Sequence, residues 1–104
     1  MAAVEFENFA EVLNEKYEHL QEPPLYRVII HNDHYTTMEF VVEILEDVFH
    51  FNQVQAEQTM MMVHRQGAGF CGEYERQIAE SKVAEVSRRA AAAGFPLRCT
   101  MEKA

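Results

Sequence analysis

A chain of 104 residues is long enough for one compact domain and leaves little room for a second. Hydrophobic residues make up 48% of it, which is enough to build a core. The formal net charge is −8, from 17 acidic against 9 basic residues. This balance argues against nucleic acid and anionic membranes as partners, since both attract clustered Lys and Arg. An acidic surface instead suits a basic partner.

The two cysteines, Cys71 and Cys99, belong to no CxxC motif, and we expect them to be reduced thiols in the core. No apolar run approaches the roughly 18 residues that predict a membrane span. The first residues, MAAVEFENF, are acidic, unlike an export or transit peptide. We therefore expect a cytoplasmic protein, and nothing in the sequence calls for a cofactor.

The first 22 residues are strongly acidic, although apolar residues recur among them at helical spacing. Pro23 and Pro24 then end any helix and mark a boundary. We expect residues 1–22 to be an N-terminal extension, either a flexible arm or a helix formed only against a partner, and residues 23–104 to be the folded domain.

The first predicted element is a strand over Leu25–His31, because LYRVIIH is rich in β-branched and aromatic residues. The residues from Asn32 to Tyr35 are of types that favour a turn. Thr36 followed by Glu39 matches a capping box, which predicts the start of a helix. The apolar stripe of this helix consists of Met38, Val41, Val42, Leu45, Val48 and Phe49.

Asn52 is the predicted N-cap of a second helix, with Ala56, Met60, Val63 and Gly67 on its inward face. A short strand over Phe70–Glu75 follows. A third helix over Gln77–Ala93 ends at Gly94 and Pro96. Its predicted inward residues are Ile78, Ala79, Val83, Val86 and Ala90.

The last predicted strand is Leu97–Lys103, in which Leu97, Cys99 and Met101 alternate onto one side. The order β-α-α-β-α-β predicts an α+β fold, with a small three-stranded antiparallel sheet covered by three helices on one face. A helical bundle with incidental extended pieces is the alternative.

Several polar groups stand out near the first predicted helix. Asn32, Asp33 and His34 lie between a buried strand and this helix, and His64 adjoins an apolar face of the second helix. Each has an ordinary structural explanation: a turn before a helix, or a histidine at the edge of the core. Together they favour a pocket between the two helices, with Asn32, His34 and His64 at its mouth. Its apolar lining would be Met38, Val41, Met60 and Val63.

Such a site suits a ligand with a large hydrophobic group beside a primary amine. Asn offers a carbonyl oxygen, neutral His a lone pair, and Asp a charged acceptor. The α-amino group of a polypeptide carries three donors, which three acceptors would satisfy. No nucleophile is paired with a base, so we expect a binding protein and not an enzyme.

The blocks HNDHYTTMEFV, MMMVHRQG, GFCG, ESKVA and PLRCTMEKA, in this order and spacing, closely resemble the bacterial ClpS adaptors. The resemblance extends from Pro23 to Ala104, and five separated blocks make it highly specific. It implies the fold of the C-terminal domain of the ribosomal stalk protein. It also implies binding of N-degrons that begin with Phe, Tyr, Trp or Leu, and their delivery to the N-terminal domain of ClpA, the unfoldase of the ClpAP protease. We expect the adaptor to be a monomer.

The resemblance also implies roles for individual residues. Asn32 and His64 would contact the α-amino group, and Met38 would exclude β-branched N-terminal residues. Glu80 and Lys82, on the third helix, would face ClpA. The pocket would be lined by Ile30, Thr36, Thr37, Met38, Val41, Met60, Val63 and Leu97.

Two positions depart from the family pattern. His34 stands where the family usually has a second Asp, and Thr37 where it usually has Pro beside the pocket. A protonated His34 would repel an ammonium group, and Asp33 would have to compensate. Because histidine ordinarily titrates near about pH 6.5, we expect binding that is weaker, more sensitive to pH, or narrower in the accepted residue.

Two other functions remain open from the residues alone. His31, Asp33, His34 and His64 are metal-ligand types, although their spacing across a turn predicts no coordination geometry. A structural or ribosome-associated module of the same fold would need none of the amine acceptors.

Overall fold

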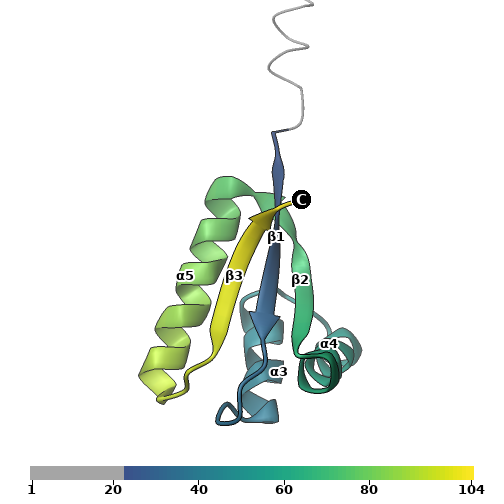
Figure 1. Ribbon diagram of the computed structural model, residues 1–104, viewed down its shortest axis with the longest axis vertical. Coiled ribbons are helices and arrows are strands. Elements are labelled where there is room, and N and C mark those ends of the chain that lie inside the picture. The colour runs from purple at the N-terminus through teal and green to yellow at the C-terminus, as the bar shows by residue number, and fades with distance from the viewer. Residues whose placement is uncertain (1–22) are drawn as a thin grey trace, which may run out of the picture.

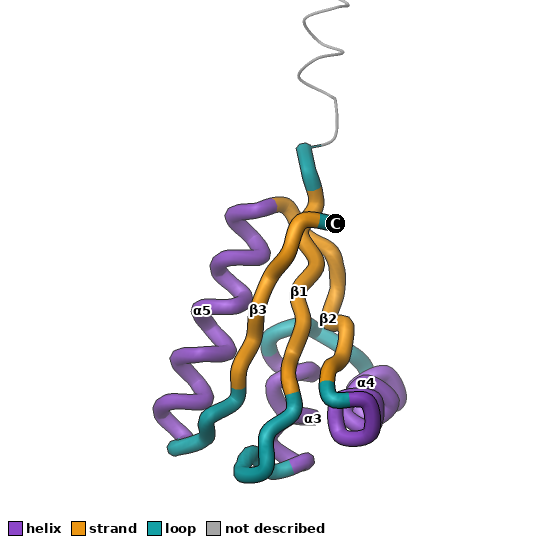
Figure 2. Tube along the Cα trace, viewed as in Figure 1, coloured by secondary structure: helices purple, strands orange, loops and turns teal. Residues whose placement is uncertain are grey.

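The computed structural model describes residues 23–104 (Figure 1, Figure 2). The predicted extension, residues 1–22, lies outside the described residues. The elements follow the predicted order: β1 (Leu25–His31), α3 (Met38–Asp47), α4 (Gln53–Gln66), β2 (Ala68–Glu75), α5 (Arg76–Ala93) and β3 (Arg98–Lys103).

The strands form one antiparallel sheet in the order β2-β1-β3. In the central strand, Val28 and Ile30 are completely buried while the preceding Arg27 is exposed, as alternation along a half-buried strand requires. The register between β1 and β2 shifts after Val28, which pairs with Gly72, while Ile29 pairs with Phe70. Cys71 is the extra residue at this bulge, and its side chain is buried.

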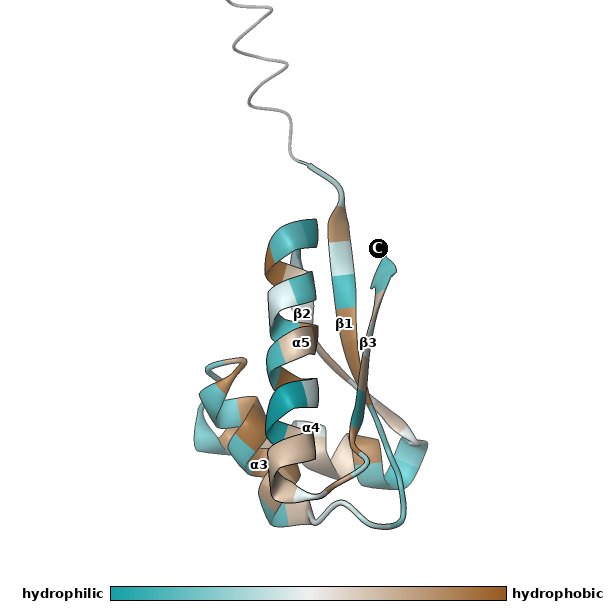
Figure 3. Ribbon diagram, turned by 90° about the vertical axis from the view of Figure 1, so that its left-hand side faces the viewer, coloured by the Kyte–Doolittle hydropathy of each residue, from teal (hydrophilic) through white to brown (hydrophobic). Residues whose placement is uncertain are grey.

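The helices and one face of the sheet enclose the core. Figure 3 shows α3 and α5 on the same side of the sheet, and α4 packs against α3 and β2. The predicted fold class is therefore confirmed. The core side chains are Val28, Ile30, Val41, Ile44, Leu45, Val48, Phe49, Ala56, Val63, Cys71, Ala79, Val86, Ala90, Leu97 and Cys99.

Both cysteines are free and buried, as predicted. Burial raises the pKa of the Cys71 thiol to about 12, with a smaller contribution from nearby Cys99. Burial likewise raises the pKa of Cys99 to about 12. Both side chains are therefore neutral core residues at physiological pH.

Two details of the predicted helices are wrong. Thr37, and not Thr36, is the N-cap of α3, and its side chain accepts a hydrogen bond from the Phe40 amide. The predicted box with Glu39 is not formed, because the hydroxyl of Thr36 donates to Asp33 instead. In α5, Ile78 is 48% exposed rather than inward, because the neighbouring Ala79 faces the sheet.

Candidate functional site

The loop from β1 to α3 is tied to the end of α4. The Asn32 amide donates to the Gly67 carbonyl oxygen at 2.9 Å, immediately after the last residue of β1. Gly67 ends α4 in the left-handed conformation (φ 89°), and its own amide donates to the Val63 carbonyl oxygen at 3.0 Å. This link brings the loop with Asn32 close to the last turn of α4, which carries His64.

Asp33 organises the turn that follows. Its Oδ1 accepts from the Tyr35 amide at 2.8 Å and the Thr36 amide at 2.7 Å, and its Oδ2 accepts from the Thr36 hydroxyl at 2.7 Å. Partial burial works against ionisation, but these hydrogen bonds outweigh it and lower the pKa of Asp33. Asp33 is therefore an ionised residue that is engaged in holding the loop.

The second wall of the site comes from α4. Asn52 and Gln55 form a reciprocal capping box at its N-terminus, which confirms the predicted cap. At its other end α4 lies very close to β2: a Cβ on Gly69 would stand 2.5 Å from Val63 Cγ2 and 3.2 Å from the Thr59 carbonyl oxygen. Glycine at position 69 thus permits this close approach of the helix that carries Val63.

Between the loop, α3 and α4 lies a cavity of about 490 Å³, which we call the terminal-residue cavity. Apolar side chains from both helices lie beneath it: Val41 and Val63 are 6% and 3% exposed, and Met38 at the rim is 40% exposed. Asn32, His34 and His64 have exposed side chains around it. Its full lining is Asn32, Asp33, His34, Tyr35, Thr36, Thr37, Met38, Glu39, Val41, Met60, Val63 and His64.

The structure thus brings nearly all of the predicted binding residues to one hollow. Ile30 and Leu97 are the exceptions. Ile30 is completely covered in β1 and Leu97 is 6% exposed, and neither lines the cavity, so they present no surface to a ligand in this structure. Tyr35 and Glu39 also line the cavity, although the sequence reasoning predicts no binding role for them. Their position inside the block HNDHYTTMEFV is the signal that could have found them.

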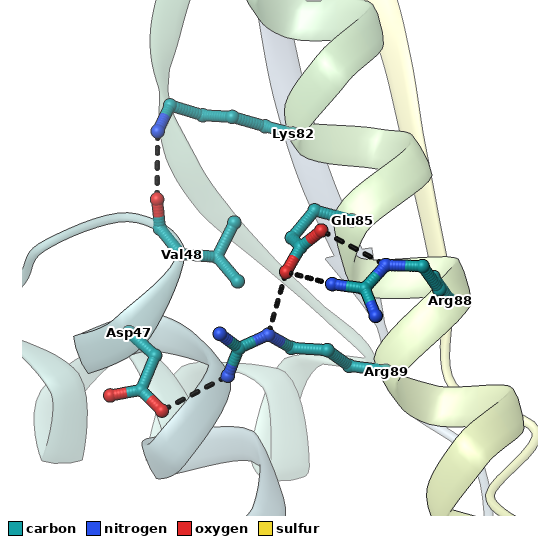
Figure 4. A network of polar contacts seen from close by, with 6 residues as sticks. All are labelled: Asp47, Val48, Lys82, Glu85, Arg88 and Arg89. Atoms are coloured by element: carbon teal, nitrogen blue, oxygen red, sulfur yellow. Dashed lines mark hydrogen bonds and ion pairs between the residues drawn. The ribbon is translucent and has the colours of Figure 1, made fainter.

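The predicted partner-facing residues of α5 have different surroundings. Glu80 is exposed and pairs with Arg76 at 3.0 Å within the helix. The Lys82 ammonium donates to the Val48 carbonyl oxygen at 2.7 Å (Figure 4). The same ammonium group lies 5.1 Å from the centre of the Tyr74 ring. Lys82 is therefore also a link between α5 and the end of α3.

A second link between these helices lies further along α5. Arg89 donates to Glu85 at 2.9 Å and to Asp47, in the last turn of α3, at 3.1 Å (Figure 4). Hydrogen bonds from Arg88 and Arg89 lower the pKa of Glu85 to about 2. Lys82 and Arg89 thus connect α5 to the helix that carries Met38 and Val41.

Within residues 23–104, no three His, Cys, Asp or Glu side chains lie close enough together to hold a metal ion. His31, one of the candidate ligand types, is instead hydrogen-bonded through Nε2 to the Thr100 hydroxyl at 2.7 Å. Burial and the nearby Arg98 lower the pKa of His31, against a smaller opposing effect of Glu102. None of the described helices is long and apolar enough to cross a bilayer.

Comparison with known proteins shows the family to which this chain belongs. Residues 21–100 match the family described as ATP-dependent Clp protease adaptor protein ClpS. The chain belongs to the ClpS family. The predicted resemblance is confirmed, and its family role is that of an adaptor of the Clp protease.

Two similar relatives are both described as ATP-dependent Clp protease adapter protein ClpS. The protein of Oleidesulfovibrio alaskensis is 52% identical over 94 residues, which is 90% of this chain and 88% of that protein. The protein of Syntrophus aciditrophicus is 50% identical over 97 residues, which is 92% of this chain and 91% of that protein.

A similar solved structure is that of Agrobacterium tumefaciens ClpS2 bound to L-phenylalaninamide. It superposes with a TM-score of 0.77 at 40% sequence identity, and the match covers 80% of this chain and all of that chain. L-Phenylalaninamide has a free α-amino group beside a large aromatic side chain, the ligand chemistry predicted above from the residues.

Proposed function

We propose that this ClpS protein binds the N-terminal residue of N-degrons in the terminal-residue cavity and delivers the bound proteins to ClpA. The ligand is a free α-amino group with the side chain of Phe, Tyr, Trp or Leu beside it. Asn32, His34 and His64 accept hydrogen bonds from the amino group. The side chain lies among Met38, Val41, Met60 and Val63, with Thr36 and Thr37 at the edge.

One observation carries the proposal: a single hollow combines an apolar base from α3 and α4 with three exposed polar side chains at its mouth. The ligand of the Agrobacterium protein supports it, because that molecule has both required parts. Asp33 contributes negative charge near the ammonium, although its oxygens already accept hydrogen bonds from the loop.

The energetics fit an adaptor that must also release its cargo. Burying a Phe or Leu side chain stabilises a complex by about 1.5–3 kcal/mol. Each hydrogen bond to the charged ammonium adds roughly 1.5–3 kcal/mol. After the entropy cost of association, a micromolar complex of about −8 kcal/mol is the expected result.

The decisive experiment compares two peptides that differ only at the amino terminus. A fluorescent peptide beginning with Phe is titrated with the protein, beside the same peptide with an acetylated α-amino group. We expect saturable binding of the free peptide and none of the acetylated one. Equal binding of both, or of neither, would refute recognition of the amino terminus.

Delivery is tested separately, with the isolated N-terminal domain of ClpA and the exposed face of α5. Glu80 is the better probe, because Lys82 also supports α3. A Glu80→Arg variant should bind the ClpA domain more weakly, while its affinity for the Phe peptide should be unchanged.

The buried, unpaired cysteines suit a reducing compartment, so we assign this activity to the cytoplasm.

A further inference from the structure

Four methionines lie on the two helices that form the site. Met38 is the first residue of α3, and Met60, Met61 and Met62 follow one another in α4. Met38 and Met60 line the terminal-residue cavity, whereas Met61 and Met62 do not. Two thioether groups thus lie where the side chain of the ligand is proposed to bind, and two chemically identical groups lie beside them on α4.

The thioethers of the cavity are open to small solutes, and the thiols of the core are not. Met38 is 40% exposed, and the half-buried Met60 lines the same open cavity. Cys71 and Cys99 are buried, and burial raises the pKa of both to about 12, so they hold little of the thiolate that reacts with a peroxide. A thioether needs no such ionisation, so the cavity methionines are oxidised before the core thiols.

Hydrogen peroxide converts an apolar methionine into a polar sulfoxide. A lone pair of the thioether sulfur attacks one peroxide oxygen, and the O–O bond breaks. The other oxygen leaves as hydroxide and takes the remaining proton to form water. Sulfur is thereby oxidised and gains an S=O bond, while the peroxide is reduced. The sulfoxide oxygen is a hydrogen-bond acceptor, and covering it with an apolar side chain leaves it without a donor, which is unfavourable.

We propose that Met38 and Met60 are a reversible oxidation site, and that their conversion to sulfoxides makes the adaptor release its ligand. The inference rests on the proposed function, because the loss concerns a Phe or Leu side chain bound against these two methionines. Methionine sulfoxide reductases reverse the change: their thiols become a disulfide and the sulfoxide oxygen leaves as water. An oxidant therefore stops the capture of N-degrons until the sulfoxides are reduced.

The test treats the full chain with increasing hydrogen peroxide, locates the added oxygen by mass spectrometry, and titrates the same samples with the Phe peptide. We expect the affinity to fall at least about tenfold as Met38 and Met60 are oxidised, and to return after reduction by methionine sulfoxide reductases of both stereospecificities. Circular dichroism follows the fold. Unchanged affinity after oxidation of both residues, or a loss that accompanies unfolding, would overturn the inference.

Two matched double variants assign the effect to the cavity. Met38→Leu with Met60→Leu keeps apolar side chains of similar volume there but removes the sulfur. Met61→Leu with Met62→Leu makes the same change at methionines that do not line the cavity. Each protein is compared with itself before and after peroxide. We expect the first variant to resist the treatment and the second to lose affinity as the parent does. Equal losses in both would refute the site.

The bound peptide provides a test without any variant. An excess of the Phe peptide should slow the oxidation of Met38 and Met60, and leave that of Met62, which is 45% exposed, unchanged. Equal rates with and without the peptide would refute the inference. If no Phe peptide binds the untreated protein, the proposed function itself fails. If the peptide binds and its affinity survives oxidation of Met38 and Met60, only this inference fails.

Discussion

Met38 lines the terminal-residue cavity and is 40% exposed, so its side chain can be shortened without opening the core. In Met38→Ala the rim of the terminal-residue cavity widens. Peptides beginning with Ile or Val, which carry a branch at Cβ, should then bind at least about tenfold more tightly than to the parent, a gain of about 1.4 kcal/mol. Peptide titration measures this. Met62→Ala is the control, since Met62 is 45% exposed on α4 and does not line the cavity. A similar gain there would contradict the role assigned to Met38.

His34 lines the terminal-residue cavity, and in the proposed function it lies beside the bound ammonium group without offering it a carboxylate. In His34→Asp a carboxylate joins Asp33 at the mouth, and we expect the Phe peptide to bind roughly threefold to tenfold more tightly, because charge-assisted hydrogen bonds exceed neutral ones. His34→Asn, which adds no charge, should leave affinity near that of the parent. Equal affinity of the parent, His34→Asp and His34→Asn proteins for the Phe peptide would rule out this role for position 34.

Local spacing was enough to predict the positions of several residues that line the cavity. The i, i+3 spacing of Met60 and Val63 placed both in the cavity, and the Asn32 and His64 positions followed from the adjoining turn and helix. The spacing did not decide between Thr36 and Thr37 as cap, because the choice depends on Asp33 holding the Thr36 hydroxyl. Nor did strand alternation show that Ile30 is covered by the core rather than open to a ligand.

The approach of α4 to β2 is the contact between elements that most affects the cavity. In Gly69→Ala the new methyl group would meet Val63 Cγ2 at 2.5 Å and the Thr59 backbone carbonyl at 3.2 Å. We expect α4 to move outward, at a cost of about 1–3 kcal/mol in the free energy of unfolding. Because α4 forms one wall of the cavity, its movement should also lower the affinity for the Phe peptide. Urea unfolding and peptide titration of the folded protein measure the two effects.

Gly94→Ala is the matched control for this variant. Gly94 has a left-handed backbone (φ 79°), and no atom lies within 4 Å of the place that a Cβ would occupy, so substitution strains only the end of α5. It should cost about 1–2 kcal/mol of stability and leave peptide affinity unchanged. If Gly69→Ala is destabilised but binds the peptide like the parent, the helix position is not what shapes the cavity.

The element order was predictable because each element carries its own signal. β1 is a β-branched run, α4 has a complete capping box, and Gly94 ends α5 in the left-handed conformation. The start of β2 was predicted two residues too late, at Phe70 instead of Ala68, although its end at Glu75 was predicted correctly. Its first residues pair with Ile30 and His31 of β1, and this pairing is a tertiary contact. The contacts of Lys82 and Arg89 with α3 could not be predicted from residue spacing either, because they join residues far apart in the chain.

The folded domain as a unit should lose stability at alkaline pH, because both thiols are buried within one core. The ordinary pKa of 9.0 applies to Cys71 and Cys99 in the unfolded chain, whereas burial raises the pKa of both to about 12 in the folded state. The unfolded chain therefore releases these protons first. Their contribution is fully present below about pH 9 and is lost as pH rises from about 9 towards 12, by up to about 1.4 kcal/mol per pH unit for each thiol.

Urea unfolding followed by circular dichroism at about pH 8, 9, 10 and 11, with reductant present, measures this loss. Tyr74 adds to it at the upper end, because burial and the nearby Cys71 raise the pKa of its phenol. A Cys71→Ala, Cys99→Ala double variant should be less stable at about pH 8, since two core side chains are shortened, but its stability should fall less steeply above about pH 9. Parallel curves for the parent and the double variant would show that thiol ionisation does not limit the alkaline stability of the core.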